Sequence, residues 1–285
     1  MSDTTIVAYL HDGTLEGFFS AIFDAYTLPQ KPDVISASDC YQDRLEQITI
    51  YVQTEERKYE RVYTGIKKHL GMDGYRKVKA VFLSCEPDKD TQLYRYLVYG
   101  FKVGRKVHVD IAHEAVNPIE RHYRDVWMET RRIMQFARFA RMDNGVYYAK
   151  VNPKHNVLPL VMDHFARRFN IQPFIIYDEI HQLAGIYDMK QWRLQYVENF
   201  SAPDCAADDR RYQKLWKTFY DSIAIKERVN HRQRRTFMPM RFWSNLTEMT
   251  YMDRESDTAQ QALDAGSILA REAYSLVSPS SNDTL

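Results

Sequence analysis

In residues 118–198, stretches with the apolar spacing of helices alternate with stretches that have the composition of strands. This pattern is the strongest constraint on the fold. Apolar residues recur at helical spacing over residues 118–142, and Pro118 suits the first turn of that helix. A second helix is expected at 158–169. Four shorter stretches have strand composition, the last three at hairpin spacing: residues 146–151, 172–178, 182–188 and 192–198. The pattern predicts an α+β fold, mainly helical, with a small central antiparallel sheet.

The flanking segments add elements to this framework. Residues 6–10 are typical of a strand, and the HDG turn that follows leads into the helical pattern LEGFFSAIFDAY. We expect another strand at 48–52, followed by a helix capped by Thr54. Further helices are predicted at residues 75–85, 89–102 and 208–228. Residues 1–249 therefore form a single predicted domain, and the acidic, Ser-rich tail at 250–285 is predicted to be partly disordered.

Composition limits the class of protein. The 285 residues are 45% hydrophobic, which is enough for a buried core. With 39 basic and 38 acidic residues the net charge is +1, so any contact with nucleic acid must be local. Cys40, Cys85 and Cys205 lie too far apart to suggest a disulfide framework or a metal motif. No basic leader or apolar span is visible, so we expect a cytoplasmic protein without a membrane contact, cofactor or metal.

A basic run near the C-terminus is the strongest candidate binding segment. Six basic residues face one acid, Glu227, which gives a local charge of +5: Lys226, Arg228, Arg232, Arg234, Arg235 and Arg241. Arginines bind phosphates through paired donors, and the nearby rings of Phe237, Phe242 and Trp243 suit stacking on an unpaired base. The alternative is a solvated loop whose arginines pair with the acidic tail.

A second candidate ridge lies on the long predicted helix. Its arginines share one face opposite the apolar stripe: Arg121, Arg124, Arg131 and Arg138. A solvated helix face is the alternative interpretation. Residues 248–285 carry seven acids and two arginines, a charge of −5. We therefore hypothesise that this tail folds over the basic run and competes with nucleic acid.

Catalytic candidates are few. Asp163 and His164 lie on the predicted helix at 158–169, and Asp178 and His181 lie near the hairpin turn. Carboxylate and imidazole groups at such spacing suit binding of a cation or general acid–base chemistry, although each also suits an ordinary turn or surface position. The sequence contains no GxxxxGK, GxGxxG, GxSxG or HExxH motif.

Three runs resemble a bacterial family of DNA-metabolism proteins with no assigned reaction. They are RRIMQFARFARMDNGVYYAKVNP, HNVLPLVMDHFARRFNIQPFIIYDEIHQLAGIYD and LWKTFYDSIAIKERVNHRQRRTFMPMRFW. The resemblance implies partnership with a radical-SAM protein of DNA modification or repair, and related domains occur fused to a uracil-DNA glycosylase. It transfers no catalytic residue. Since this chain has no CxxxCxxC motif, a partner would supply any radical chemistry.

Three functions are compatible with these features. The favoured one is an accessory protein of DNA repair or modification that binds nucleic acid, a radical-SAM partner, or both. The second is a nucleic-acid-processing hydrolase that uses Asp163, His164, Asp178 and His181. The third is a protein adaptor without nucleic-acid contact, and it differs from the first because phosphate contacts make binding steeply salt-dependent.

Overall fold

The computed structural model describes residues 5–42, 46–198, 200, 205–223 and 230–249. The chain divides into two compact units. Unit 1 comprises residues 1–135 and 153–168, and unit 2 comprises residues 136–152 and 169–285. No helix in the described part of the chain is long and apolar enough to cross a membrane.

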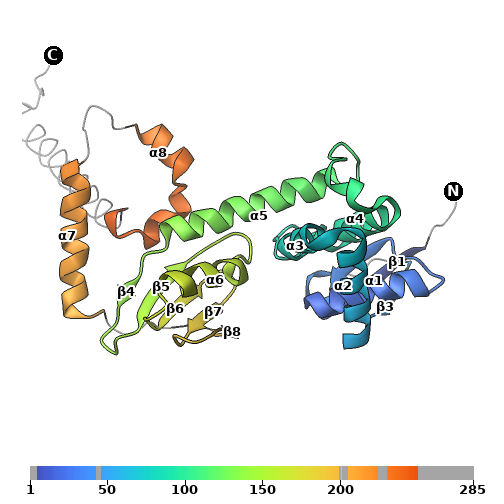
Figure 1. Cartoon of the computed structure of the whole chain (residues 1–285), viewed down its shortest axis with the longest axis horizontal. Coiled ribbons are helices and arrows are strands. Elements are labelled where there is room, and N and C mark those ends of the chain that lie inside the picture. The colour runs from blue at the N-terminus through green and yellow to red at the C-terminus, as the bar shows by residue number, and fades with distance from the viewer. Residues whose placement is uncertain (1–4, 43–45, 199, 201–204, 224–229, 250–285) are drawn as a thin grey trace, which may run out of the picture. The chain divides into compact units, whose positions relative to one another are not determined.

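Unit 1 is built on a three-stranded parallel sheet with strand order β2-β1-β3. Figure 1 labels β1 and β3 of this sheet. Its strands are β1 (Ile6–His11), β2 (Val34–Ala37) and β3 (Gln47–Tyr51). Its helices are α1 (Leu15–Thr27), α2 (Glu56–His69), α3 (Gly71–Phe82), α4 (Lys89–Val103), most of α5 (Asn117–Phe136), and α6 (Leu158–Arg168). A parallel sheet needs crossover connections, and α1 provides the one between β1 and β2.

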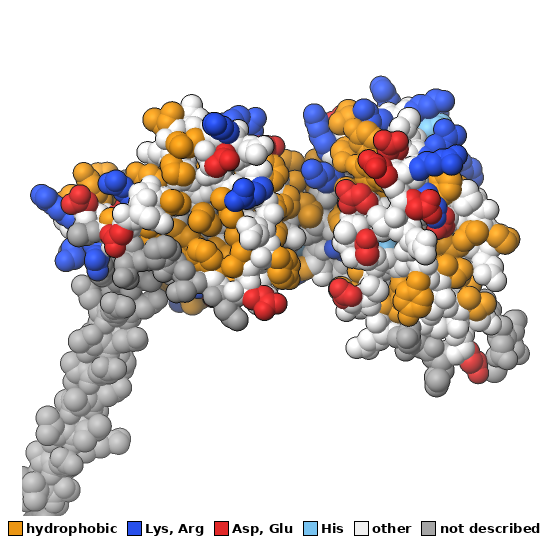
Figure 2. Space-filling model, turned by 90° about the horizontal axis from the view of Figure 1, so that it is seen from below, with side chains coloured by type: hydrophobic (Ala, Val, Ile, Leu, Met, Phe, Trp, Pro, Cys, Tyr) orange, Lys and Arg blue, Asp and Glu red, His pale blue; other side chains and the backbone are white. Residues whose placement is uncertain are grey.

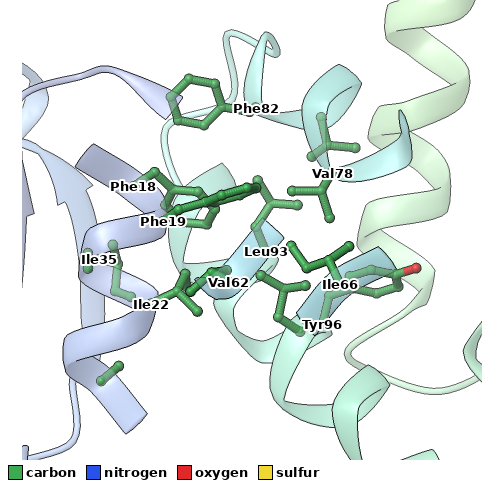
Figure 3. Packing of buried hydrophobic residues seen from close by; sticks show 14 of the residues in the cluster. Phe18, Phe19, Ile22, Ile35, Val62, Ile66, Val78, Phe82, Leu93 and Tyr96 are labelled. Atoms are coloured by element: carbon green, nitrogen blue, oxygen red, sulfur yellow. The ribbon is translucent and has the colours of Figure 1, made fainter. Parts of the chain in front are cut away.

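The core of unit 1 forms where α1 to α4 pack together. Figure 3 shows Phe18 and Phe19 of α1 directed toward Leu93 of α4 and the aliphatic residues of α2 and α3. Phe18, Phe19, Ile66 and Leu93 are fully buried. Burial of such side chains, each worth about 1.5–3 kcal/mol, is the main source of stability of this unit.

The β1–α1 turn is closed by the chain itself. Thr14 caps α1 by accepting a hydrogen bond from the Gly17 N–H, and the Asp12 carboxylate accepts bonds from the Thr14 N–H and hydroxyl. The Thr54 hydroxyl donates to the other Asp12 oxygen at 2.8 Å. These bonds outweigh burial and lower the pKa of Asp12. The prediction that Thr54 caps α2 is wrong, because its hydroxyl serves Asp12 and no side chain caps that helix.

Unit 2 contains a mixed five-stranded sheet of order β4-β5-β6-β7-β8. Its strands are β4 (Ala140–Arg141), β5 (Tyr147–Val151), β6 (Phe174–Asp178), β7 (Leu183–Tyr187) and β8 (Trp192–Tyr196). Only β5 and β6 pair in parallel. The remaining elements are α7 (Ala207–Ile223), α8 (His231–Phe237) and the short 3-10 helix η4 (Met240–Asn245). Between β4 and β5, Gly145 has a φ of 83°, which glycine adopts without strain.

The α+β class and most of the predicted elements are confirmed, but the single central antiparallel sheet is wrong. The sheet of unit 1 is parallel and that of unit 2 is mixed. The four-residue strand β2 was not predicted because it is too short to show a period. The long helix ends at Phe136 rather than near residue 142, since β4 pairs with β5 just beyond it. Tertiary pairing overrides the helical period there.

Candidate nucleic-acid interface

Three arginines of the predicted basic run lie on α8. Arg232 and Arg235 are exposed, and Arg234 is half-buried. The helix is begun by Asn230, whose side chain accepts a hydrogen bond from the Gln233 N–H. Arg228 lies outside the described residues. The described part of the run therefore presents two exposed arginines from a short, capped helix, and the guanidinium group is the kind of donor that binds phosphate oxygens.

The segment after α8 is fixed to the sheet of unit 2. The Asn152 side chain at the end of β5 donates to the Arg241 carbonyl at 2.8 Å, and the exposed Arg241 guanidinium lies 4.8 Å from the centre of the Phe242 ring. The half-buried Trp243 donates its indole N–H to the Met238 carbonyl. Of the predicted stacking rings, Trp243 is thus tied to its own segment, whereas Phe237 on α8 is exposed.

Helix α7 presents an apolar stripe to solvent. Its members recur at helical spacing and are all exposed: Tyr212, Leu215, Trp216, Phe219 and Ile223. Hydrophobic side chains are also exposed among charged ones elsewhere on both units (Figure 2). Periodicity alone does not single out this stripe, because a core-facing helix has the same pattern. The structure, and not the sequence, shows that this stripe is exposed. Exposed apolar patches are typical of interaction sites.

A buried carboxylate connects α7 to the start of unit 2. The Arg138 guanidinium donates to both oxygens of Glu248, at 2.7 and 3.3 Å, and the Trp216 indole N–H donates to Glu248 at 3.2 Å. The side chain of Glu248 is 5% exposed and that of Arg138 is 29% exposed. Burial raises the pKa of Glu248, but the bonds from Arg138 and Trp216 outweigh it and hold that pKa below its usual value. Glu248 is therefore an ionised anchor for both partners.

A pocket of about 490 Å³ lies in unit 1 beside β2 and α4, and a pocket of about 420 Å³ lies in unit 2. The second combines rings with polar groups. Its lining consists of Arg138, Phe139, Asp209, Tyr212, Gln213, Trp216 and Thr247. Of these, Arg138 alone was predicted as a binding residue. The others were missed because they come from three segments that are distant in the sequence.

The predicted arginine ridge is divided by the end of α5. Arg121, Arg124 and Arg131 are exposed on that helix in unit 1. Arg138 lies beyond the helix, in unit 2, where it pairs with Glu248. The apolar stripe on the other face of α5 is core, since its residues Ile119, Val126 and Ile133 are buried.

Each unit contains two of the four catalytic candidates. Asp163 and His164 lie on α6 in unit 1, where Asp163 is exposed and the His164 ring packs against Phe165. In unit 2, Asp178 is the last residue of β6 and His181 lies in the turn between β6 and β7. Among the described residues, no group of three or more His, Cys, Asp or Glu side chains is arranged to hold a metal ion.

Asp178 and His181 form a close carboxylate–imidazole contact. Asp178 is fully buried, and one of its oxygens lies 2.6 Å from the His181 Nδ1. Its other oxygen accepts the backbone N–H groups of Ile180 and His181. The backbone bonds are those of a carboxylate that stabilises a tight turn. The same contact also orients a partly exposed imidazole, as in a general base held by a carboxylate.

Comparison with models of known protein families assigns the chain to one family. Residues 87–248 match the family DUF4130, described as a domain of unknown function. Because the match covers more than half of the chain, the protein belongs to this family. The matched region begins just before α4 and ends at Glu248, so it includes both the arginines of α8 and the Arg138–Glu248–Trp216 contacts. No curated protein matches the chain.

Proposed function

We propose that this protein is an accessory factor of DNA repair or modification that binds nucleic acid through unit 2. The observation that carries the proposal is that one unit contains both exposed arginines, on α8, and an exposed aromatic stripe, on α7. Single-stranded nucleic acid is bound by this combination, because guanidinium groups contact phosphates while rings stack on unpaired bases. A near-neutral net charge is compatible with such local contact.

The proposed partner is a radical-SAM protein of DNA modification or repair. This part of the proposal is supported by the resemblance of the three sequence runs to the DNA-metabolism family. In such an arrangement the partner performs the chemistry and this chain holds the nucleic acid.

The test is binding of the full chain to labelled single-stranded and duplex DNA across a salt series. The variant Arg232→Ala/Arg234→Ala/Arg235→Ala removes the charges of α8. Its control is Arg57→Ala/Arg61→Ala/Lys68→Ala, which removes the same charge from exposed positions on α2 in unit 1. We expect the α8 variant to lose affinity and the control to keep it. Equal losses in both would indicate general electrostatics, and no DNA binding at low salt would favour the adaptor function.

A nucleic-acid-processing hydrolase is the second candidate, favoured by the contact between buried Asp178 and His181. Its test is incubation of single-stranded and duplex DNA with the full chain and with His181→Ala. This candidate would be supported if the wild type cleaves DNA or releases a base and the His181→Ala variant does not. The variant must also keep the unfolding midpoint of the wild type. Equal product in the two proteins, or none in either, would exclude His181 as the general base for these substrates.

A further inference from the structure

We propose that the 420 Å³ pocket of unit 2 takes one unstacked nucleobase that carries an exocyclic amine. The inference rests on the proposed nucleic-acid function and adds the part of the nucleic acid that is recognised. It is argued from the pocket's rings, its polar groups and its charge.

The walls of the pocket are aromatic. Its lining includes Phe139 and two rings of α7, Tyr212 and Trp216, which lie one helical turn apart on that helix. Trp216 keeps 44% of its surface exposed although its indole N–H is fixed by Glu248. A ring held in one orientation loses little conformational entropy when a base stacks on it, and each stacked base contributes substantially to affinity.

Two polar groups of the pocket, those of Asp209 and Gln213, offer acceptor oxygens. The Gln213 amide nitrogen donates to the Asp209 carboxylate at 2.8 Å and to the Cys205 sulfur at 3.6 Å. With the amide assigned in this orientation, its carbonyl oxygen accepts no hydrogen bond from the described residues. That oxygen and the Asp209 carboxylate therefore suit a ligand edge that donates. Adenine and cytosine present such an edge through their exocyclic amines, whereas thymine presents carbonyl acceptors there.

The charge of the pocket disfavours phosphate. Among the described lining residues Arg138 is the one cation, and Glu248 neutralises it through two hydrogen bonds. Asp209 then leaves the lining with a negative balance. The phosphates of a bound strand must consequently lie outside this pocket, where the exposed arginines of α8 provide the cations. A volume of about 420 Å³ is in the range of pockets for small ligands and accommodates a base with its sugar.

The experiment uses the full chain and a labelled strand of abasic nucleotides that carries one central cytosine, adenine or thymine. Such a strand keeps every phosphate contact and offers a single base. Compared with the fully abasic strand, one cytosine or adenine is expected to increase affinity about tenfold, and thymine less. Tyr212→Ala should abolish this gain. Tyr196→Ala is the matched control, since Tyr196 of β8 and Tyr212 are both 69% exposed and Tyr196 is not among the described residues that line the pocket.

Each outcome decides between the two proposals. A base-dependent gain that Tyr212→Ala removes and Tyr196→Ala retains supports the pocket assignment. Salt-dependent binding that is identical for all four strands overturns the pocket and leaves nucleic-acid binding by unit 2 intact. Equal gains for all three bases overturn the preference for an amine. Absence of binding to every strand, including ordinary single-stranded DNA, contradicts the proposed function and the pocket together.

Discussion

At the scale of single residues, Glu248 is the side chain on which our stability predictions for unit 2 depend. Its buried carboxylate fixes the Arg138 guanidinium and the Trp216 indole, which come from distant parts of the sequence. A buried carboxylate in this position is stabilising only while both partners remain, because a charge left alone in a low-dielectric interior is costly. The sequence places Glu248 at the start of an acidic tail and gives no indication that it is a core residue.

We expect Glu248→Gln to destabilise the protein by about 1–3 kcal/mol at neutral pH. The full cost of breaking a buried ion pair is about 3–5 kcal/mol, and the partial exposure of Arg138 reduces it. Urea unfolding of both proteins measures the difference. Arg76→Gln is a useful control because its partner Asp73 is largely exposed, and that pair should contribute little. A loss below about 0.5 kcal/mol for Glu248→Gln would contradict the anchoring role.

The same pair makes stability depend on pH. The pKa of Glu248 is lowered in the folded state, so the unfolded chain binds its proton first as the pH falls. The stabilisation is complete above the ordinary glutamate pKa of 4.5 and is lost as the pH falls through the lower folded-state pKa. The stability difference between wild type and Glu248→Gln should accordingly narrow below about pH 4.5. A difference that stays constant from pH 7 to pH 3 would show that the carboxylate charge is not involved.

At the scale of elements, the β1–α1 connection shows how one glycine sets a turn. A Cβ at Gly17 would come within 2.1 Å of the Asp12 Oδ1 and 2.9 Å of the Thr54 hydroxyl oxygen. The absence of a side chain therefore lets the Asp12 carboxylate reach the two threonines. Gly65 in α2 differs, since a Cβ there would make only ordinary contacts of 3.7 and 3.8 Å with Phe101.

Gly17→Ala and Gly65→Ala should change stability in opposite directions. We expect Gly17→Ala to lower the free energy of unfolding by about 1–3 kcal/mol, because the Asp12 carboxylate must shift and lose some of the three hydrogen bonds that it accepts. Gly65→Ala should stabilise the protein by about 0.5–1 kcal/mol, because alanine loses less backbone entropy in a helix. Thermal unfolding of the two variants measures both effects. Destabilisation of equal size in both would indicate that the contacts of Asp12 do not set this turn.

The elements and the hairpin pairing of β6, β7 and β8 were largely predictable, and the parallel pairing of strands was not. The helical period of LEGFFSAIFDAY and the strand composition of FIIYD are local signals, and α1 and β6 form where they predict. Parallel pairing of β1 with β2 and β3 depends on residues up to some forty positions apart, so no local pattern reveals it. The pocket in unit 2 was unpredictable for the same reason, since Phe139, Trp216 and Thr247 meet only in the fold.

At the scale of the whole molecule, the charge distribution suggests the hypothesis that the acidic tail competes with nucleic acid for the arginines of α8. The described part of unit 2 carries the exposed arginines of α8, and residues 251–285 carry six acids and two arginines in sequence. Opposite charges on one chain attract and compete with external ligands. The hypothesis that this tail covers the basic run concerns residues outside those described, and it remains a prediction.

Deleting residues 251–285 is expected to increase affinity for single-stranded DNA about three- to tenfold at low salt, because a competing net charge of −4 is removed. The truncation point spares Glu248 and the buried Met249. An unchanged unfolding midpoint is the control for folding. Affinity equal to that of the full chain would contradict competition by the tail.

The most direct test of the account is the slope of log affinity against log salt for single-stranded DNA. Each phosphate contact contributes about 0.7 to that slope. Replacing Arg232, Arg234 and Arg235 by alanine should therefore reduce its magnitude by about 2, while the α2 control variant keeps the wild-type slope. Wild-type binding with an unchanged slope in the α8 variant, or a salt-independent wild type, would contradict the proposal that unit 2 holds nucleic acid through α8.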